Sequence, residues 1–155
     1  MFEDLIKKTA EAYGLEWTWI KAIVTQESNF NPYALRYEPR YMYLYKVPIF
    51  AHKLGISEDT EMMTQKMSFG LGQVMLALAR EQGFEKEAGL LFDPEINLDQ
   101  VCKRIYTLKH RALDTPDDVF AGYNGGPGAM VRRGEIFSNQ GYVDSVKRHL
   151  KTITA

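Results

Sequence analysis

Apolar residues recur at helical rather than strand spacing along most of this 155-residue chain, and glycine and proline separate the apolar segments. The pattern predicts an all-α, or α-dominated α+β, fold. The helices that it predicts cover residues 2–13, 16–28, 57–67, 71–82, 94 onward, 116 to about 125, and 142–150. Residues 33–50 differ, because five tyrosines and two prolines crowd this segment, and they are interpreted as a loop or short hairpin.

Start and stop signals support these bounds. Gly14 suits the left-handed residue that follows a helix, and Pro32 disfavours helical geometry at the residue before it. Ser57 is a suitable N-cap, with two acidic residues in the first turn after it. In Asp93-Pro94-Glu95 an N-cap aspartate precedes a proline at the first helical position, and residues 115–118 repeat the signal. The helix from residue 94 is predicted to bury Leu98, Val101, Cys102, Ile105 and Leu108.

Composition narrows the class of protein. The chain is 45% hydrophobic and 25% charged, which is typical of a globular protein, and its length predicts a single domain over residues 1–155. Nineteen Lys and Arg against twenty Asp and Glu argue against a nucleic-acid partner. Cys102 is the only cysteine, so intramolecular disulfides are excluded. The three histidines, His52, His110 and His149, are too far apart for a local metal motif, and no metal is indicated.

The amino-terminal end reads Met1-Phe2-Glu3-Asp4, which is acidic where a secretory signal is basic, and no adequate apolar region follows. We therefore expect that the chain as given carries no export signal. The longest apolar stretch, residues 69–79, is interrupted by Gln73 and is far shorter than the roughly 20 residues of a membrane span. No integral membrane segment is expected.

Glu27 is the first candidate for chemistry. Helical spacing places this carboxylate on the same face as Ile20, Ile23 and Val24. Burial and the carboxyl end of a helix both disfavour the charged form, so we expect a raised pKa for Glu27 and the role of a general acid. The alternative is a frayed helix end at which Glu27 is an ordinary exposed glutamate.

Two glycine-rich segments supply further candidates. In residues 68–73, two glycines permit close backbone approach next to Gln73, whose amide both donates and accepts hydrogen bonds. In residues 121–128, four glycines would present Tyr123 and Asn124 on a fixed turn. A plain loop before a helix and a plain helix cap are the respective alternatives. Tyr142, at the start of the last helix, is by itself more typical of a packing residue.

In order and spacing, these pieces resemble the catalytic domain of soluble lytic transglycosylases, peptidoglycan-cleaving enzymes of the lysozyme superfamily that are related to goose-type lysozyme. Residues 27–32 resemble the family's Glu-Ser-x-Phe-x-Pro motif, and residues 70–73 resemble Gly-Leu-Met-Gln. Residues 121–126 resemble Ala-Tyr-Asn-Gly-Gly, and Tyr142-Val143 resembles the late Tyr-Val element. Residues 91–98 are similar to the family's helix start between the second and third motifs.

The resemblance implies a lysozyme-like fold and a lytic transglycosylase that uses one glutamate. Glu27 would protonate the glycosidic oxygen between N-acetylmuramic acid and N-acetylglucosamine, and would then deprotonate the muramyl C6 hydroxyl to close a 1,6-anhydro ring. It implies no cofactor, peptidoglycan glycan strands as the partner, and a monomer. The implied substrate-contacting or glutamate-orienting residues are Ser28, Gln73, Tyr123, Asn124 and Tyr142. Whether Tyr123 or Tyr142 donates to Glu27 or to the acetamido group stays open.

Two features depart from the family pattern. Gly72 stands where the family usually has Met, and residues 33–66 are longer than in compact members, so their tyrosines form either an added substrate-facing wall or a peripheral packed cluster. The rival functions are a muramidase of the same fold and a cell-wall-binding module without turnover. Without an export signal, the chain is expected to be either a trimmed domain or a phage lysis or virion protein acting in the periplasm or cell wall.

Overall fold

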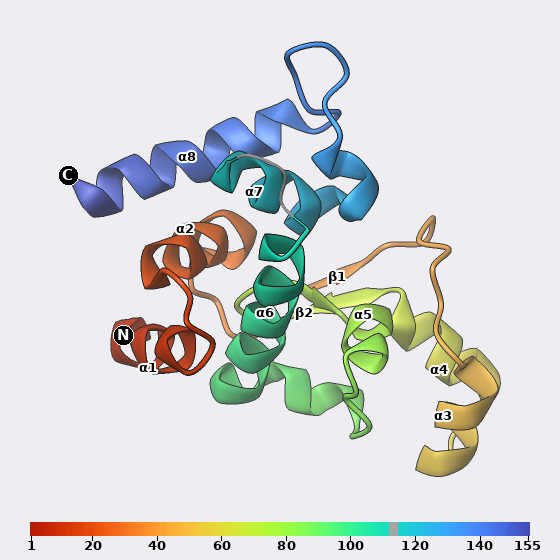
Figure 1. Cartoon of the computed structure of the whole chain (residues 1–155). Coiled ribbons are helices and arrows are strands. Elements are labelled where there is room, and N and C mark those ends of the chain that lie inside the picture. The colour runs from red at the N-terminus through yellow and green to blue at the C-terminus, as the bar shows by residue number, and fades with distance from the viewer. Residues whose placement is uncertain (112–114) are drawn as a thin grey trace. The chain divides into compact units, whose positions relative to one another are not determined.

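The computed structural model describes residues 1–111 and 115–155 (Figure 1). Within these residues there are eight α-helices, two 3-10 helices and one three-stranded sheet, so the α-dominated fold is confirmed. The chain divides into two compact units, which are described separately. The terminal unit comprises residues 1–26 and 101–155, and the central unit comprises residues 27–100. That the whole chain forms one domain stays a prediction.

The terminal unit is helical. Its boundaries fall inside two helices, because residues 27–28 of α2 and residues 94–100 of α6 are assigned to the central unit. Its other elements lie wholly within the unit. Its helices are α1 (Glu3–Ala12), α2 (Trp17–Ser28), α6 (Pro94–Lys109), α7 (Pro116–Gly125), the 3-10 helix η2 (Pro127–Met130) and α8 (Gln140–Thr154). Their buried side chains include Ile6, Ile20, Ile23, Val24, Val101, Cys102, Ile105, Leu108, Phe120, Val143 and Val146. The stripe predicted for the helix from residue 94 is therefore buried in full, since Leu98 is buried as well.

The predicted helix ends of this unit follow from local chemistry. Gly14 has a φ of 63°, and after it the Leu15 N–H donates to the Ala10 carbonyl, as in a Schellman motif. At the start of α7, the Asp118 carboxylate accepts from the Thr115 N–H at 2.8 Å. The last helix begins at Gln140, two residues earlier than predicted, and continues to Thr154.

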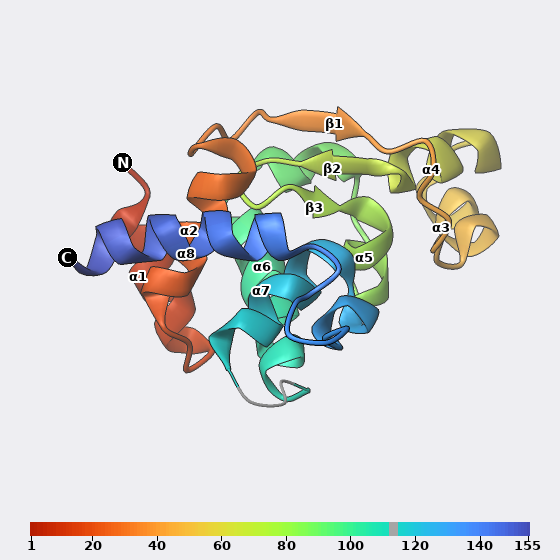
Figure 2. The ribbon, with the colours of Figure 1, turned by 90° about the horizontal axis from the view of Figure 1, so that it is seen from above.

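The central unit combines the sheet with short helices. The strands β1 (Leu35–Tyr37), β2 (Met67–Phe69) and β3 (Val74–Met75) are antiparallel in the order β1-β2-β3 (Figure 2). The helices are α3 (Val47–Leu54), α4 (Glu58–Gln65), α5 (Leu76–Glu81) and the 3-10 helix η1 (Ala88–Phe92). Ser57 caps α4 as predicted, because its Oγ accepts from the Thr60 N–H at 3.1 Å. Asp93 caps α6 in the same way, accepting from two backbone N–H groups.

Two predictions in the central unit were wrong in detail. Residues 33–50 do not form a local hairpin, because β1 pairs with β2 in the register Leu35↔Phe69 and residues 47–50 begin α3. The helix predicted from Leu71 begins at Leu76 instead, since Gly70–Gln73 turns the chain from β2 into β3. In both places a non-local strand pairing decided the structure, which local spacing does not reveal.

A buried ion pair crosses the central unit. Arg80 of α5 donates from Nε to Glu61 of α4 at 2.8 Å, and both side chains are fully buried. Gln65 donates to the same carboxylate at 2.9 Å, and Arg80 also donates to the carbonyls of Phe84 and Lys86. Every charge in this cluster is therefore matched, which is the condition under which buried ions are tolerated. Among the described residues, no helix is both long and apolar enough to span a membrane.

Candidate active site

Glu27 lies in the last turn of α2 and is half-buried, with Ser28 as the final helical residue. The Ser28 Oγ donates to the Leu71 carbonyl at 2.7 Å. This bond joins the end of α2 to the Gly70–Gln73 turn, which lies more than 40 positions later in the sequence. Two of the predicted motifs are thus connected directly inside the central unit.

The chain leaves α2 in an unusual conformation. Asn29 and Phe30 both have positive φ, 48° and 63°, and the helix ends before Pro32 requires it. A left-handed residue other than glycine costs roughly 1–2 kcal/mol, and asparagine tolerates it better than phenylalanine. Strained backbone of this kind persists only where surrounding contacts fix it, and such positions cluster at functional sites.

Gln73 also lies in the left-handed region, with a φ of 48°. Its amide nitrogen donates to the carbonyls of Ala34 at 3.1 Å and Gly70 at 3.2 Å. Its Oε1 accepts from the buried Ser68 Oγ at 3.0 Å. Both amide N–H groups are therefore used within the central unit, where they hold β1 and the turn together, and only the second lone pair of Oε1 is left over.

Asn97 of α6 holds the same turn from its other side. Its fully buried side chain accepts from the Gly72 N–H at 2.9 Å and donates to the carbonyls of Phe69 and Leu91, both at 2.8 Å. Gly70 has a φ of 67°, and a Cβ there would lie 2.6 Å from the Asn97 Nδ2. Glycine at position 70 is thus required both by the backbone angle and by the close approach of this amide.

Two glycines on either side of Tyr123 and Asn124 serve close packing in the terminal unit. A Cβ at Gly122 would lie 2.8 Å from side-chain atoms of Leu108 and Met130, and one at Gly125 would lie 2.6 Å from the Ala129 Cβ. Gly126, with a φ of 79°, ends α7. Gly122 and Gly125 are therefore explained by packing and Gly126 by the helix end, and Asn124, which is exposed, and Tyr123, which is half-buried, lie in the last turn of α7.

Asn139 fixes the orientation of the Asn124 amide. The Asn139 Nδ2 donates to the Ala121 carbonyl at 2.9 Å and to the Asn124 Oδ1 at 3.0 Å. Because the backbone carbonyl of Ala121 only accepts, the Asn139 nitrogen must face it, and Asn124 must present its oxygen to the same nitrogen. The Asn124 N–H groups therefore point away from Asn139. Tyr142 is half-buried in the first turn of α8.

The six predicted site residues are divided between the units. Glu27, Ser28 and Gln73 belong to the central unit, and the remaining three, Tyr123, Asn124 and Tyr142, belong to the terminal unit. The structure brings Ser28 to the turn that ends in Gln73, and the convergence of all six on one site stays a prediction. Within residues 1–111 and 115–155, no group of three or more His, Cys, Asp and Glu side chains is arranged to hold a metal ion.

Three polar residues that organise the site were missed in the sequence. They are Ser68, Asn97 and Asn139, and each acts by holding a motif residue or its backbone. Asn97 lies within residues 91–98, the segment that matches a family pattern, so its place was visible although its role was not. Ser68 likewise begins the candidate segment 68–73, although its role was not predicted, whereas Asn139 carries no spacing signal of its own.

Comparisons with known proteins point to the same family that the motifs resemble. A family model described as the transglycosylase SLT domain matches residues 4–143. A membrane-bound lytic murein transglycosylase C from Haemophilus influenzae is 27% identical over 166 aligned residues, covering 96% of this chain and 40% of that protein. Proteins of the same name from Pectobacterium atrosepticum and Yersinia pestis are 28% and 27% identical over 87% and 83% of this chain. The chain spans 40% or less of the length of these relatives.

Proposed function

Since this chain belongs to the transglycosylase SLT domain family, we propose that it is a peptidoglycan lytic transglycosylase. It cleaves the β-1,4 bond between N-acetylmuramic acid and N-acetylglucosamine and leaves 1,6-anhydromuramyl ends. The proposal rests chiefly on one observation. The Ser28 Oγ ties the helix end that carries Glu27, the proposed general acid, to the Gly70–Gln73 turn, so two family motifs meet there.

In the first step, Glu27 acts as the acid. Its protonated carboxyl donates a proton to the glycosidic oxygen, and the bond from that oxygen to the muramyl C1 breaks with its electron pair on the leaving sugar. The carbonyl oxygen of the substrate's own acetamido group attacks C1 and takes up the developing positive charge. An internal nucleophile already in place removes the need for a second carboxylate.

In the second step, Glu27 acts as the base. Its carboxylate takes the proton of the muramyl C6 hydroxyl while that oxygen bonds to C1, and the acetamido oxygen leaves C1 with its electron pair. Glu27 is protonated again at the end and no water is consumed. One residue thus alternates between acid and base, and the cycle uses no cofactor.

We propose different tasks for the other residues, and the contacts described above support them. Ser28 positions Glu27 by fixing the last turn of α2. Gln73 holds the turn through its two N–H donors, and its remaining acceptor is what it offers to an N–H of the substrate. Asn124 offers the complementary donor, since Asn139 occupies its oxygen. Tyr123 or Tyr142 donates to Glu27 or to the acetamido group.

The proposed setting is the periplasm or cell wall, where peptidoglycan strands are the partner. The protein is proposed to act there as a monomer, either as a phage lysis or virion protein or as the catalytic part of a longer chain.

Digestion of purified sacculi by the Glu27→Gln variant tests this function. General acid–base catalysis contributes about 10²–10⁴-fold, so the release of muropeptides should fall by at least about 100-fold while the thermal unfolding transition is kept. Glu16→Gln is the matched control, because Glu16 is an exposed glutamate that precedes α2. A folded Glu27→Gln variant with undiminished release would remove Glu27 from the mechanism.

A further inference from the structure

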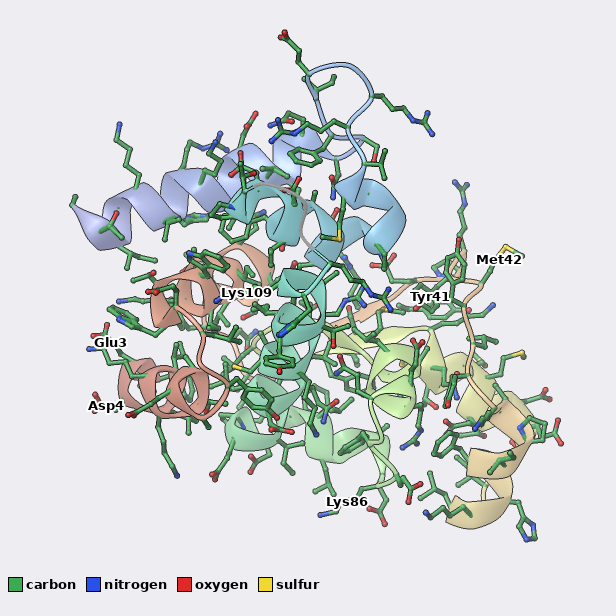
Figure 3. All side chains as sticks on the ribbon, viewed as in Figure 1. Glu3, Asp4, Tyr41, Met42, Lys86 and Lys109 are labelled. Atoms are coloured by element: carbon green, nitrogen blue, oxygen red, sulfur yellow. The ribbon has the colours of Figure 1, made fainter. Side chains whose placement is uncertain are left out.

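Three tyrosines of the central unit expose their rings to solvent along the segment that follows Pro32. The exposed fractions are 75% for Tyr33, 46% for Tyr37 and 83% for Tyr43, and we call these three residues the tyrosine platform. Met42, beside Tyr43, is also exposed, and Figure 3 shows its side chain pointing away from the loop between β1 and α3. Several large aromatic and apolar side chains are thus exposed along one segment, and exposed apolar surface of this kind marks binding sites.

The backbone that carries the platform is tied to the rest of the central unit. After β1, the Glu38 N–H donates to the Lys66 carbonyl at 2.7 Å, and the Tyr41 N–H donates to the Glu38 carbonyl at 3.0 Å. The Lys66 Nζ approaches the Pro39 carbonyl at 3.4 Å. These bonds tie the loop between β1 and α3 to Lys66, so the tyrosine rings are carried by a backbone that is held in place.

The far end of the segment is held by the buried ion pair. The Gln65 side chain bonds both backbone groups of Tyr45: its Oε1 accepts from the Tyr45 N–H at 2.8 Å and its Nε2 donates to the Tyr45 carbonyl at 2.9 Å. The same Nε2 donates to Glu61, which Arg80 neutralises. A fully buried network therefore fixes the position of Tyr45, two residues after Tyr43.

Ring contacts orient two of the platform tyrosines. The Tyr43 ring meets the Tyr41 ring edge to face, with centroids 5.8 Å apart. The Tyr33 ring lies 6.4 Å from that of Phe92, which in turn packs on Phe69 of β2 at 5.3 Å. The rings are thus supported on one side and open on the other, which lowers the entropy lost when a ligand binds.

The platform is continuous with the turn of the candidate site. The Ala34 carbonyl, between Tyr33 and Leu35, accepts from both the Gly70 N–H at 2.8 Å and the Gln73 Nε2 at 3.1 Å. A polymer that reaches Gln73 is therefore close to the start of the segment that carries the platform, within the same unit.

Charge around the platform favours an anionic ligand. Residues 33–46 carry three basic side chains against one acidic one, in a chain whose net charge is −1. Arg36 pairs with Glu38, whereas Arg40 is exposed at the loop and Lys46 lies at the start of α3. A ligand with apolar faces and carboxylates would match both the rings and these cations.

We propose that the tyrosine platform is a binding site for the glycan strand of peptidoglycan, outside the bond that is cleaved. The C–H faces of sugar rings along the strand lie on the electron-rich faces of Tyr33 and Tyr43, and the carboxylates of the attached peptides lie near Arg40. The identity of this ligand rests on the proposed function. The site itself holds substrate and takes no part in bond breaking.

Binding is measured in a Glu27→Gln background, so that no strand is cleaved during the experiment. The protein is co-sedimented with intact sacculi and, separately, with soluble glycan strands from which the peptides have been removed and which are immobilised on beads. Tyr33→Ala and Tyr43→Ala should each weaken binding to both ligands by roughly threefold to tenfold. Arg40→Ala should weaken binding to sacculi more than binding to peptide-free strands, which lack the carboxylates of the peptides. Tyr106→Ala is the matched control, because Tyr106 is a 45% exposed tyrosine of the terminal unit.

Two results would overturn the inference. One is undiminished binding of both tyrosine variants to sacculi. The other is a loss confined to sacculi, with binding to peptide-free strands unchanged, which would make the platform a peptide site. Each variant is first shown to keep the thermal unfolding midpoint of its parent. Because binding is scored without cleavage, a wild-type protein that makes no anhydromuramyl products would refute the proposed function and leave this result interpretable.

Discussion

Replacing Asn97 by alanine tests whether one buried amide holds the turn of the candidate site. The Asn97 side chain makes three hydrogen bonds of 2.8–2.9 Å, to the Gly72 N–H and to the carbonyls of Phe69 and Leu91. The substitution leaves one donor and two acceptors without this partner in a place that solvent does not reach. A lost hydrogen bond costs about 0.5–1.5 kcal/mol net, and a buried group left unsatisfied costs about 1–3 kcal/mol. With three groups affected, the free energy of unfolding should therefore fall by at least about 3 kcal/mol.

Urea unfolding followed by circular dichroism measures this loss. With an m-value of about 2 kcal/mol per molar, a loss of 3 kcal/mol lowers the midpoint by about 1.5 M. Asn31→Ala is the control, because Asn31 is exposed and its side chain accepts from the Tyr33 N–H at 3.0 Å. Its effect should stay below about 1 kcal/mol. A comparably small effect for Asn97→Ala would refute the reasoning.

Two further predictions concern stability. Arg80→Met leaves the Glu61 carboxylate buried beside no cation and should cost about 3–5 kcal/mol in urea unfolding, whereas the double variant Arg80→Met/Glu61→Leu should regain most of that loss. A double variant no more stable than the single one would contradict this. Hydrogen bonds from Lys21 and Lys7 lower the pKa of Glu3 from 4.5 to about 2. The stabilisation they bring is complete above about pH 4.5 and is lost as the pH falls toward 2, so Glu3→Gln should flatten the acid limb of the stability profile there. An unchanged limb would refute the pairing.

Local signals in the sequence were enough to predict most helix ends. At Gly14, Ser57 and Asp93, each hydrogen bond that ends or caps a helix joins residues only a few positions apart. A short stretch of sequence is therefore enough to predict it. The sheet could not be predicted, because its first two strands pair across about 30 positions of sequence. The strands β1 and β2 are only three residues long and lie far apart in the chain, so neither has a recognisable alternation. Helix α3 was missed because Pro48 read as a loop residue, although proline suits a first helical turn.

In the candidate site, too, local motifs could be read from the sequence and long-range contacts could not. Glu27, Gln73 and Asn124 could be named as candidates from the sequence because motifs mark them, and their roles stay predictions. The residues that hold them were not, since Asn97 and Asn139 act on backbone or amide groups that only folding brings near. The task of Gln73 also changed with the structure. Its amide was expected to meet the substrate with both donor and acceptor, yet its donors are committed to the carbonyls of Ala34 and Gly70.

The central claim is that one glutamate closes an anhydro ring without water, and mass spectrometry of sacculus digests in ¹⁸O-labelled water tests it most directly. A lytic transglycosylase releases 1,6-anhydromuramyl products, each lighter by one water than the reducing sugar and free of the label. We predict these products from the wild-type protein, and their loss in Glu27→Gln. Reducing muramyl ends that carry ¹⁸O would contradict the account, because they would show that water attacks C1 and that the protein is a muramidase.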